Sequence, residues 1–129
     1  MTSIAWFRDL RRDDTSVAGG KGANLGELAA AGFLVPPGFV VTAGAYLRAM
    51  DAGGVRARLH EEAMGVDVDD PVALDAASER LRALVVGAGM PEALRAEILA
   101  AYHELGRDSV VAVRSSATSE DTAATSFAG

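Results

Sequence analysis

Apolar side chains recur every three or four positions along most of the chain, and this spacing predicts amphipathic helices. The clearest example is 92–105, which places four large residues on one stripe and ends at Gly106. Another helix is expected after Asp70-Pro71, a capping residue followed by proline at the first helical position. The predicted helices are those from Lys21 to a stop at Gly32, from a Thr42 cap through Met50, 55–64, from Asp70-Pro71 through Val85, and 92–105.

Three short apolar runs instead predict strands, and the second and third of them are rich in β-branched residues. They are 4–7, 39–41 and 110–113, and the charged stretch 8–16 between the first run and the helices is expected to be a loop. Aromatic residues make up 5% of the sequence, and Ala, Val and Leu supply most of the apolar content, which favours helices around a small sheet over an all-β sandwich. The predicted class is α/β (α+β), in one domain at most for 129 residues.

Composition excludes several functions. A net charge of −6 and a pI of about 4.8 argue against a nucleic-acid partner, because phosphate backbones are bound by clustered Lys and Arg. The absence of cysteine excludes disulfides, thiolate nucleophiles and thiolate zinc sites. Neither a signal peptide nor a membrane-length apolar run is evident, so we expect a cytoplasmic protein with no membrane partner.

A glycine motif, 19–22, carries the first candidate chemistry. It places backbone N–H groups at a helix start, where the helix dipole favours an anion, and Lys21 can meet a phosphate oxygen. The motif is not a Walker loop, which requires glycine in place of Thr15 and a hydroxyl residue in place of Gly22. It also lacks the strand and downstream acidic residue of a dinucleotide fingerprint. A flexible loop followed by a helix cap is the alternative interpretation.

The second candidate is an arginine that directly follows the last predicted strand. The planar guanidinium of Arg114 suits phosphate oxygens, and Ser115, Ser116 and Thr118 add hydroxyl groups beside it. The acidic pair 120–121 can hold Arg114 or a magnesium-bound water, or simply form a solvated turn. We expect the two distant motifs to converge on the phosphates of a nucleotide. His60 and His103 are expected at the surface, so no catalytic residue and no metal ligand are assigned.

These segments resemble the N-terminal nucleotide-binding region of the phosphoenolpyruvate synthase and pyruvate phosphate dikinase family, which also includes rifamycin phosphotransferases. The segments that carry the resemblance are 19–28, 32–42, 113–121 and 126–129. The resemblance implies the first lobe of an ATP-grasp fold over 1–129, truncated at the phosphate-binding loop. It also implies ATP binding by Lys21, Arg114 and Gly129, with Mg²⁺ ligands outside this chain.

The implied activity is phosphoryl transfer from ATP to pyruvate, giving phosphoenolpyruvate, AMP and phosphate through a phosphohistidine on an absent domain. The remaining ATP-binding lobe and that phosphohistidine domain are the implied partners. A rifamycin is the alternative acceptor, because the ATP-binding region is similar in both subfamilies. For the isolated chain, a non-catalytic fragment or partner-binding module is the alternative function.

Overall fold

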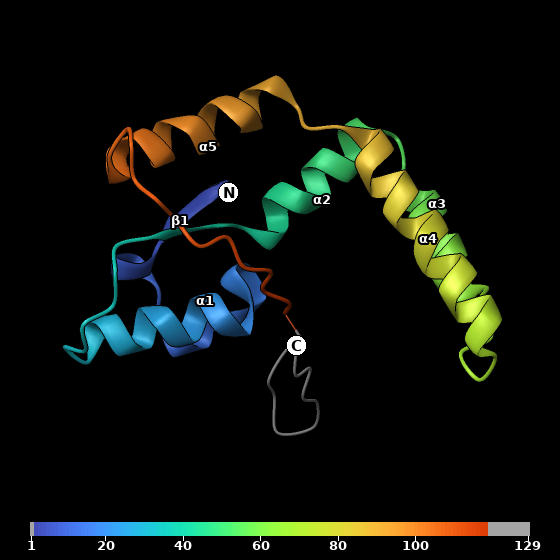
Figure 1. The fold of residues 1–129 in the computed structure, drawn as a ribbon, viewed down its shortest axis with the longest axis horizontal. Coiled ribbons are helices and arrows are strands. Elements are labelled where there is room, and N and C mark those ends of the chain that lie inside the picture. The colour runs from blue at the N-terminus through green and yellow to red at the C-terminus, as the bar shows by residue number, and fades with distance from the viewer. Residues whose placement is uncertain (1, 119–129) are drawn as a thin grey trace. The chain divides into compact units, whose positions relative to one another are not determined.

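A computed structural model describes residues 2–118 of the chain (Figure 1). These residues form two compact units. The terminal unit contains the described residues up to Tyr46 and from Ala93 onwards, and the middle unit is Leu47–Glu92. Within the described residues, five α-helices accompany a two-stranded sheet, which confirms the mixed α/β class.

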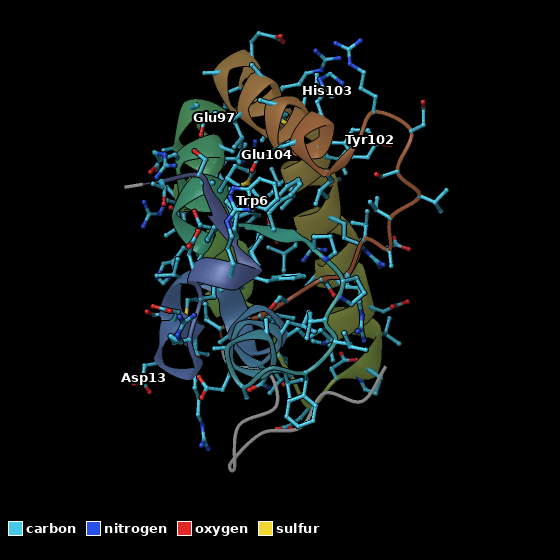
Figure 2. The ribbon with its side chains drawn as sticks, turned by 90° about the vertical axis from the view of Figure 1, so that its left-hand side faces the viewer. Trp6, Asp13, Glu97, Tyr102, His103 and Glu104 are labelled. Atoms are coloured by element: carbon cyan, nitrogen blue, oxygen red, sulfur yellow. The ribbon has the colours of Figure 1, made fainter. Side chains whose placement is uncertain are left out.

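The sheet of the terminal unit pairs β1 (Ile4–Trp6) with β2 (Phe39–Val41) in antiparallel register, with Ile4 opposite Val41 and Trp6 opposite Phe39. The rings of Trp6 and Phe39 meet edge to face at 5.4 Å, a preferred aromatic geometry. The Arg8 guanidinium lies 4.6 Å from the centre of the Trp6 ring and pairs with Glu104 of α5 (Glu92–Leu105) at 3.1 Å (Figure 2). Arg8 therefore links the sheet to α5.

The loop predicted for 8–16 is wrong, because most of this stretch is helical. It contains parts of two 3₁₀ turns, Phe7–Asp9 and Arg12–Asp14, and the start of α1 (Thr15–Ala30). The Asp14 carboxylate accepts a 2.7 Å hydrogen bond from the Arg11 amide, and the Glu27 carboxylate accepts one from the Arg12 amide at 3.0 Å. Side chains thus satisfy the exposed amides of this turn, which the charge pattern alone did not reveal.

Helix α1 begins earlier than the predicted start at Lys21, but it is kinked at Gly19, where φ is 71° and ψ is 173°. The residues after Gly19 consequently start a new helical segment, so the prediction that the glycine pair lies at a helix N-terminus is confirmed. Gly32, with φ of 85°, follows the end of α1, and the Phe33 amide donates to the Leu28 carbonyl at 3.1 Å. This confirms the predicted stop.

The middle unit contains most of α2 (Ala43–Ala52), followed by α3 (Arg56–Met64) and α4 (Pro71–Ala88). The Asp70 carboxylate accepts hydrogen bonds from the Val72 and Ala73 amides at 2.9 and 3.2 Å, which confirms the predicted cap. An ion pair of 2.8 Å joins Arg80 of α4 to Glu62 of α3. None of the helices in 2–118 is both long and apolar enough to cross a membrane.

The third predicted strand, 110–113, is wrong for the described residues, in which the sheet consists of β1 and β2 alone. Val110 and Val113 are fully or almost fully exposed, at 101% and 93%. A β-branched run becomes a strand when a neighbouring backbone accepts its ladder hydrogen bonds, and neither β1 nor β2 does so here.

Small side chains make up most of the buried apolar positions. Within residues 2–118, six of the ten are alanine, so backbone segments can approach closely where glycine is also present. The buried apolar residues are Leu10, Ala18, Ala23, Ala45, Ala49, Met50, Val55, Ala77, Leu94 and Ala101.

Candidate functional site

The two candidate motifs meet in the terminal unit, where the segment around Ser116 lies against the kink of α1 (Figure 1). The Ser116 hydroxyl donates to the Ala18 carbonyl at 2.9 Å and accepts from the Gly22 amide at 3.4 Å. The Gly20 amide donates to the Ala117 carbonyl at 3.0 Å. Since these side-chain bonds join residues 94 and 98 positions apart, the predicted convergence of the two motifs is confirmed.

Glycine is required where the segments touch. A Cβ on Gly19 would overlap the Ser116 side chain and come within 2.8 Å of its carbonyl carbon, and the φ of 71° would also strain any residue other than glycine. A Cβ on Gly22 would lie 2.8 Å from Val40 Cγ2. These glycines therefore allow α1 to contact both β2 and the serine segment.

The convergence brings the two predicted phosphate-binding side chains into one region. Lys21 is half-buried and follows Gly20 directly, whereas Arg114 is exposed and lies two residues before Ser116. Two extended residues span roughly 7 Å at most, so the Cα atom of Arg114 lies within roughly 7 Å of the Cα atom of Ser116, the residue that contacts α1. Both cations therefore belong to the same junction, which we call the Lys21–Arg114 junction.

Lysine occurs once in the sequence, at position 21, whereas the other eleven of the twelve basic residues are arginine. An ε-ammonium group is a compact charge with three rotatable donors, while guanidinium offers a planar fork of donors. The junction therefore contains two basic residues whose side chains differ in donor geometry. Lys21 is also the one lysine side chain that reagents specific for amines can modify.

Two backbone amides of the glycine motif bond to the serine segment, whereas the sequence predicts that amides of this motif face a ligand. The Gly20 amide donates to the Ala117 carbonyl, and the Gly22 amide donates to the Ser116 hydroxyl. The sequence indicates Ser116 as a hydroxyl donor beside Arg114, but it does not reveal the bonds of Ser116 to α1. The signal that could have revealed these bonds is a small hydroxyl residue in one motif together with a glycine pair in the other, because glycine leaves space for the hydroxyl to reach the backbone.

Other candidate residues are placed as follows. Ser115 and Thr118 are exposed, and Gly129, Glu120 and Asp121 lie outside the described residues. His60 on α3 is exposed. His103 on α5 is also exposed (Figure 2), so the predicted surface positions of both histidines are confirmed. In the part of the chain that the structure describes, no three His, Cys, Asp or Glu side chains group as a metal site would require.

A separate hollow of about 300 Å³ lies in the middle unit, outside the Lys21–Arg114 junction. Charged side chains of both signs line it, and the Arg80–Glu62 ion pair occupies one side. The lining residues are Arg58, Glu61, Glu62, Gly65 and Arg80. Because its positive charges are matched by acidic neighbours, this hollow is less suited to a polyphosphate than the junction is.

The family model for the AMP/ATP-binding domain of pyruvate phosphate dikinase matches residues 15–129, which include both motifs. The chain belongs to this family. This confirms the resemblance to the N-terminal ATP-binding region of phosphoenolpyruvate synthases and pyruvate phosphate dikinases.

Similar proteins carry the name phosphoenolpyruvate synthase. A probable phosphoenolpyruvate synthase of Methanocaldococcus jannaschii is 49% identical over 100% of this chain and 11% of its own length. One of Methanothermobacter thermautotrophicus is 44% identical over 98% of this chain and 19% of its own length. The phosphoenolpyruvate synthase of Deinococcus radiodurans is 41% identical over 100% of this chain and 17% of its own length. The chain therefore spans less than a fifth of these relatives.

Proposed function

We propose that this chain is the ATP-binding N-terminal portion of a phosphoenolpyruvate synthase-like phosphotransferase, and that Lys21 and Arg114 hold the phosphates of ATP. The observation that carries this proposal is the junction itself: hydrogen bonds between residues 94 and 98 positions apart bring the lysine and arginine segments together. Membership of the AMP/ATP-binding domain family supports ATP as the ligand.

The side chains at the junction fit a polyphosphate by charge and by donor geometry. Arg114 makes no hydrogen bond or ion pair with another described residue, and its exposed guanidinium is therefore available to pair with two phosphate oxygens. Lys21 adds a second cation at the start of a helical segment, where the dipole also favours negative charge. ATP supplies the phosphoryl group, and these two side chains would orient and partly neutralise it.

For the whole protein, the proposed reaction converts ATP, pyruvate and water to AMP, phosphoenolpyruvate and phosphate through a phosphohistidine on another domain. Pyruvate is favoured over a rifamycin as acceptor because the similar proteins described above are phosphoenolpyruvate synthases. An ATP-grasp lobe, a contact of Gly129 with phosphate, and Mg²⁺ bound by ligands elsewhere complete the proposal.

By itself, the chain is proposed to bind ATP without turning it over. Phosphoryl transfer needs cations and metal ligands arranged around the phosphates, and the junction supplies two cations. Exposed large apolar residues of the terminal unit, including Leu34 at 103% and Val110 at 101%, also favour association with a partner surface.

Calorimetric titration of the 129-residue chain with ATP tests the proposal. Lys21→Ala and Arg114→Ala should each weaken ATP binding about tenfold, because each removes a charge-assisted phosphate contact. Arg107→Ala is the matched control: this residue is exposed, belongs to the same unit and lies outside both motifs. Equal affinity for the wild type and both junction variants would refute the assignment of Lys21 and Arg114.

A further inference from the structure

The glycine motif and the serine segment share hydrogen bonds that leave little room for a phosphate on the backbone. Two amides at the start of the second α1 segment, those of Gly20 and Gly22, already donate to Ala117 and Ser116. A phosphate could use these two amides only after the serine segment had moved away. The glycines therefore allow the serine segment to contact α1, and this contact affects how Lys21 and Arg114 are placed relative to each other.

Ser116 is the centre of this contact. Its hydroxyl donates to the carbonyl that precedes the kink and accepts from the amide two residues after Gly20, so one side chain spans both sides of the kink. Gly19 lacks the Cβ that would overlap Ser116, and its φ of 71° directs the backbone around the hydroxyl. The kink of α1 thus provides both the space and the two backbone hydrogen-bond partners for the Ser116 side chain.

We infer that Ser116 is a positioning residue that holds the Lys21 and Arg114 segments in one fixed arrangement, with phosphate recognised by the two side chains and not by the glycine amides. This inference rests on the proposed function, since it deepens the account of the same ATP site. Fixing both cations before ATP arrives avoids the entropy cost of ordering two segments in the bound state.

The neighbouring hydroxyl provides a matched control. Ser115 lies between Arg114 and Ser116, is exposed, and makes no hydrogen bond with the other described residues. Ser115→Ala removes the same chemical group from the same segment without removing a bond to α1. Ser116→Thr is the conservative variant, because it keeps the hydroxyl and adds a methyl group at an exposed position.

The test combines amide hydrogen exchange, observed by NMR in the 129-residue chain, with calorimetric titration by ATP. Ser116→Ala should speed exchange of the Gly20 and Gly22 amides about tenfold and weaken ATP binding about tenfold, the loss expected for two modest hydrogen bonds. Ser115→Ala should change neither quantity more than about twofold, and Ser116→Thr should restore both. In the wild type, ATP should leave the Gly20 and Gly22 amides protected.

Exchange of the Val72 and Ala73 amides, which donate to Asp70 in the middle unit, reports whether each variant is folded there. The inference is overturned if Ser116→Ala leaves ATP affinity unchanged or increases it while Lys21→Ala lowers it, and the proposed function then survives. Deprotection of the Gly20 and Gly22 amides by ATP would also overturn it, since the amides would then be the phosphate ligands. If the wild-type chain binds no ATP, the proposed function fails and the inference fails with it.

Discussion

Gly19 and Gly89 have almost the same backbone conformation but serve different purposes in the two units. Both have φ of 71°, with ψ of 173° at Gly19 and −174° at Gly89, a region that is essentially restricted to glycine. Gly89 follows α4 in the middle unit, and an added Cβ there would meet nothing within 4 Å. Gly19 instead receives Ser116 from the far end of the terminal unit. At position 89, glycine is thus needed because of the backbone conformation alone. At position 19, it is needed both for the backbone conformation and because a Cβ would overlap Ser116.

The same difference extends to the other interactions of the two units. The middle unit uses local bonds: Asp70 caps α4, and the Arg56–Asp51 and Arg80–Glu62 pairs span 5 and 18 positions. The Ser116 bonds of the terminal unit span 94 and 98 positions. Long-range contacts depend on the whole unit being folded, so substitutions at the junction should have effects beyond their immediate neighbours.

The largest effect is expected from Gly19→Ala, with Gly89→Ala as its control. Both variants incur backbone strain of about 1–3 kcal/mol, and Gly19→Ala adds about 2 kcal/mol from overlap with Ser116. Chemical denaturation should therefore show a greater loss of unfolding free energy for Gly19→Ala, and calorimetry a loss of ATP binding for this variant alone. Equal losses of stability would show that the close approach of Ser116 contributes little.

A smaller effect is expected from two helical glycines. In α1, a Cβ on Gly26 would lie 2.5 Å from Leu10 Cβ and 2.7 Å from the Leu10 carbonyl oxygen, so Gly26→Ala should destabilise the chain by about 2 kcal/mol. In α4, Gly87 has open space, and Gly87→Ala should stabilise the chain by up to about 1 kcal/mol through helix propensity. The thermal midpoint should fall for the first variant and rise for the second. Two shifts of the same sign would contradict the packing role of Gly26.

Local signals predicted the helices well. The cap at Asp70, the stop at Gly32 and the stripe of α5 depend on interactions within a few residues, which a sequence displays directly. The strand predicted at 110–113 failed because strand formation depends on a partner backbone, which local sequence does not specify. The loop predicted at 8–16 failed because the amides there are satisfied by Asp14 and Glu27, and the latter belongs to a distant turn of α1.

The meeting of the two candidate motifs was predictable from the sequence, but the contacts between them were not. Clusters of glycine, lysine, arginine and hydroxyls indicated an anion site, and the structure brings the Lys21 and Arg114 segments together. Which polar groups face a ligand and which bond to each other depends on three-dimensional register. For that reason, the sequence did not show that the Ser116 hydroxyl bonds to α1 whereas the neighbouring Ser115 hydroxyl does not.

The most direct test of the ATP site uses the single lysine of the chain. An amine-specific reagent is applied to the wild-type chain with ATP, with adenosine or with neither, and modification of Lys21 and of the N-terminal amine is followed by mass spectrometry after digestion. ATP should slow modification of Lys21 about tenfold relative to adenosine without protecting the N-terminal amine, and Arg114→Ala should remove most of this protection. Equal modification of Lys21 in ATP and in adenosine would contradict the claim that it binds the phosphates.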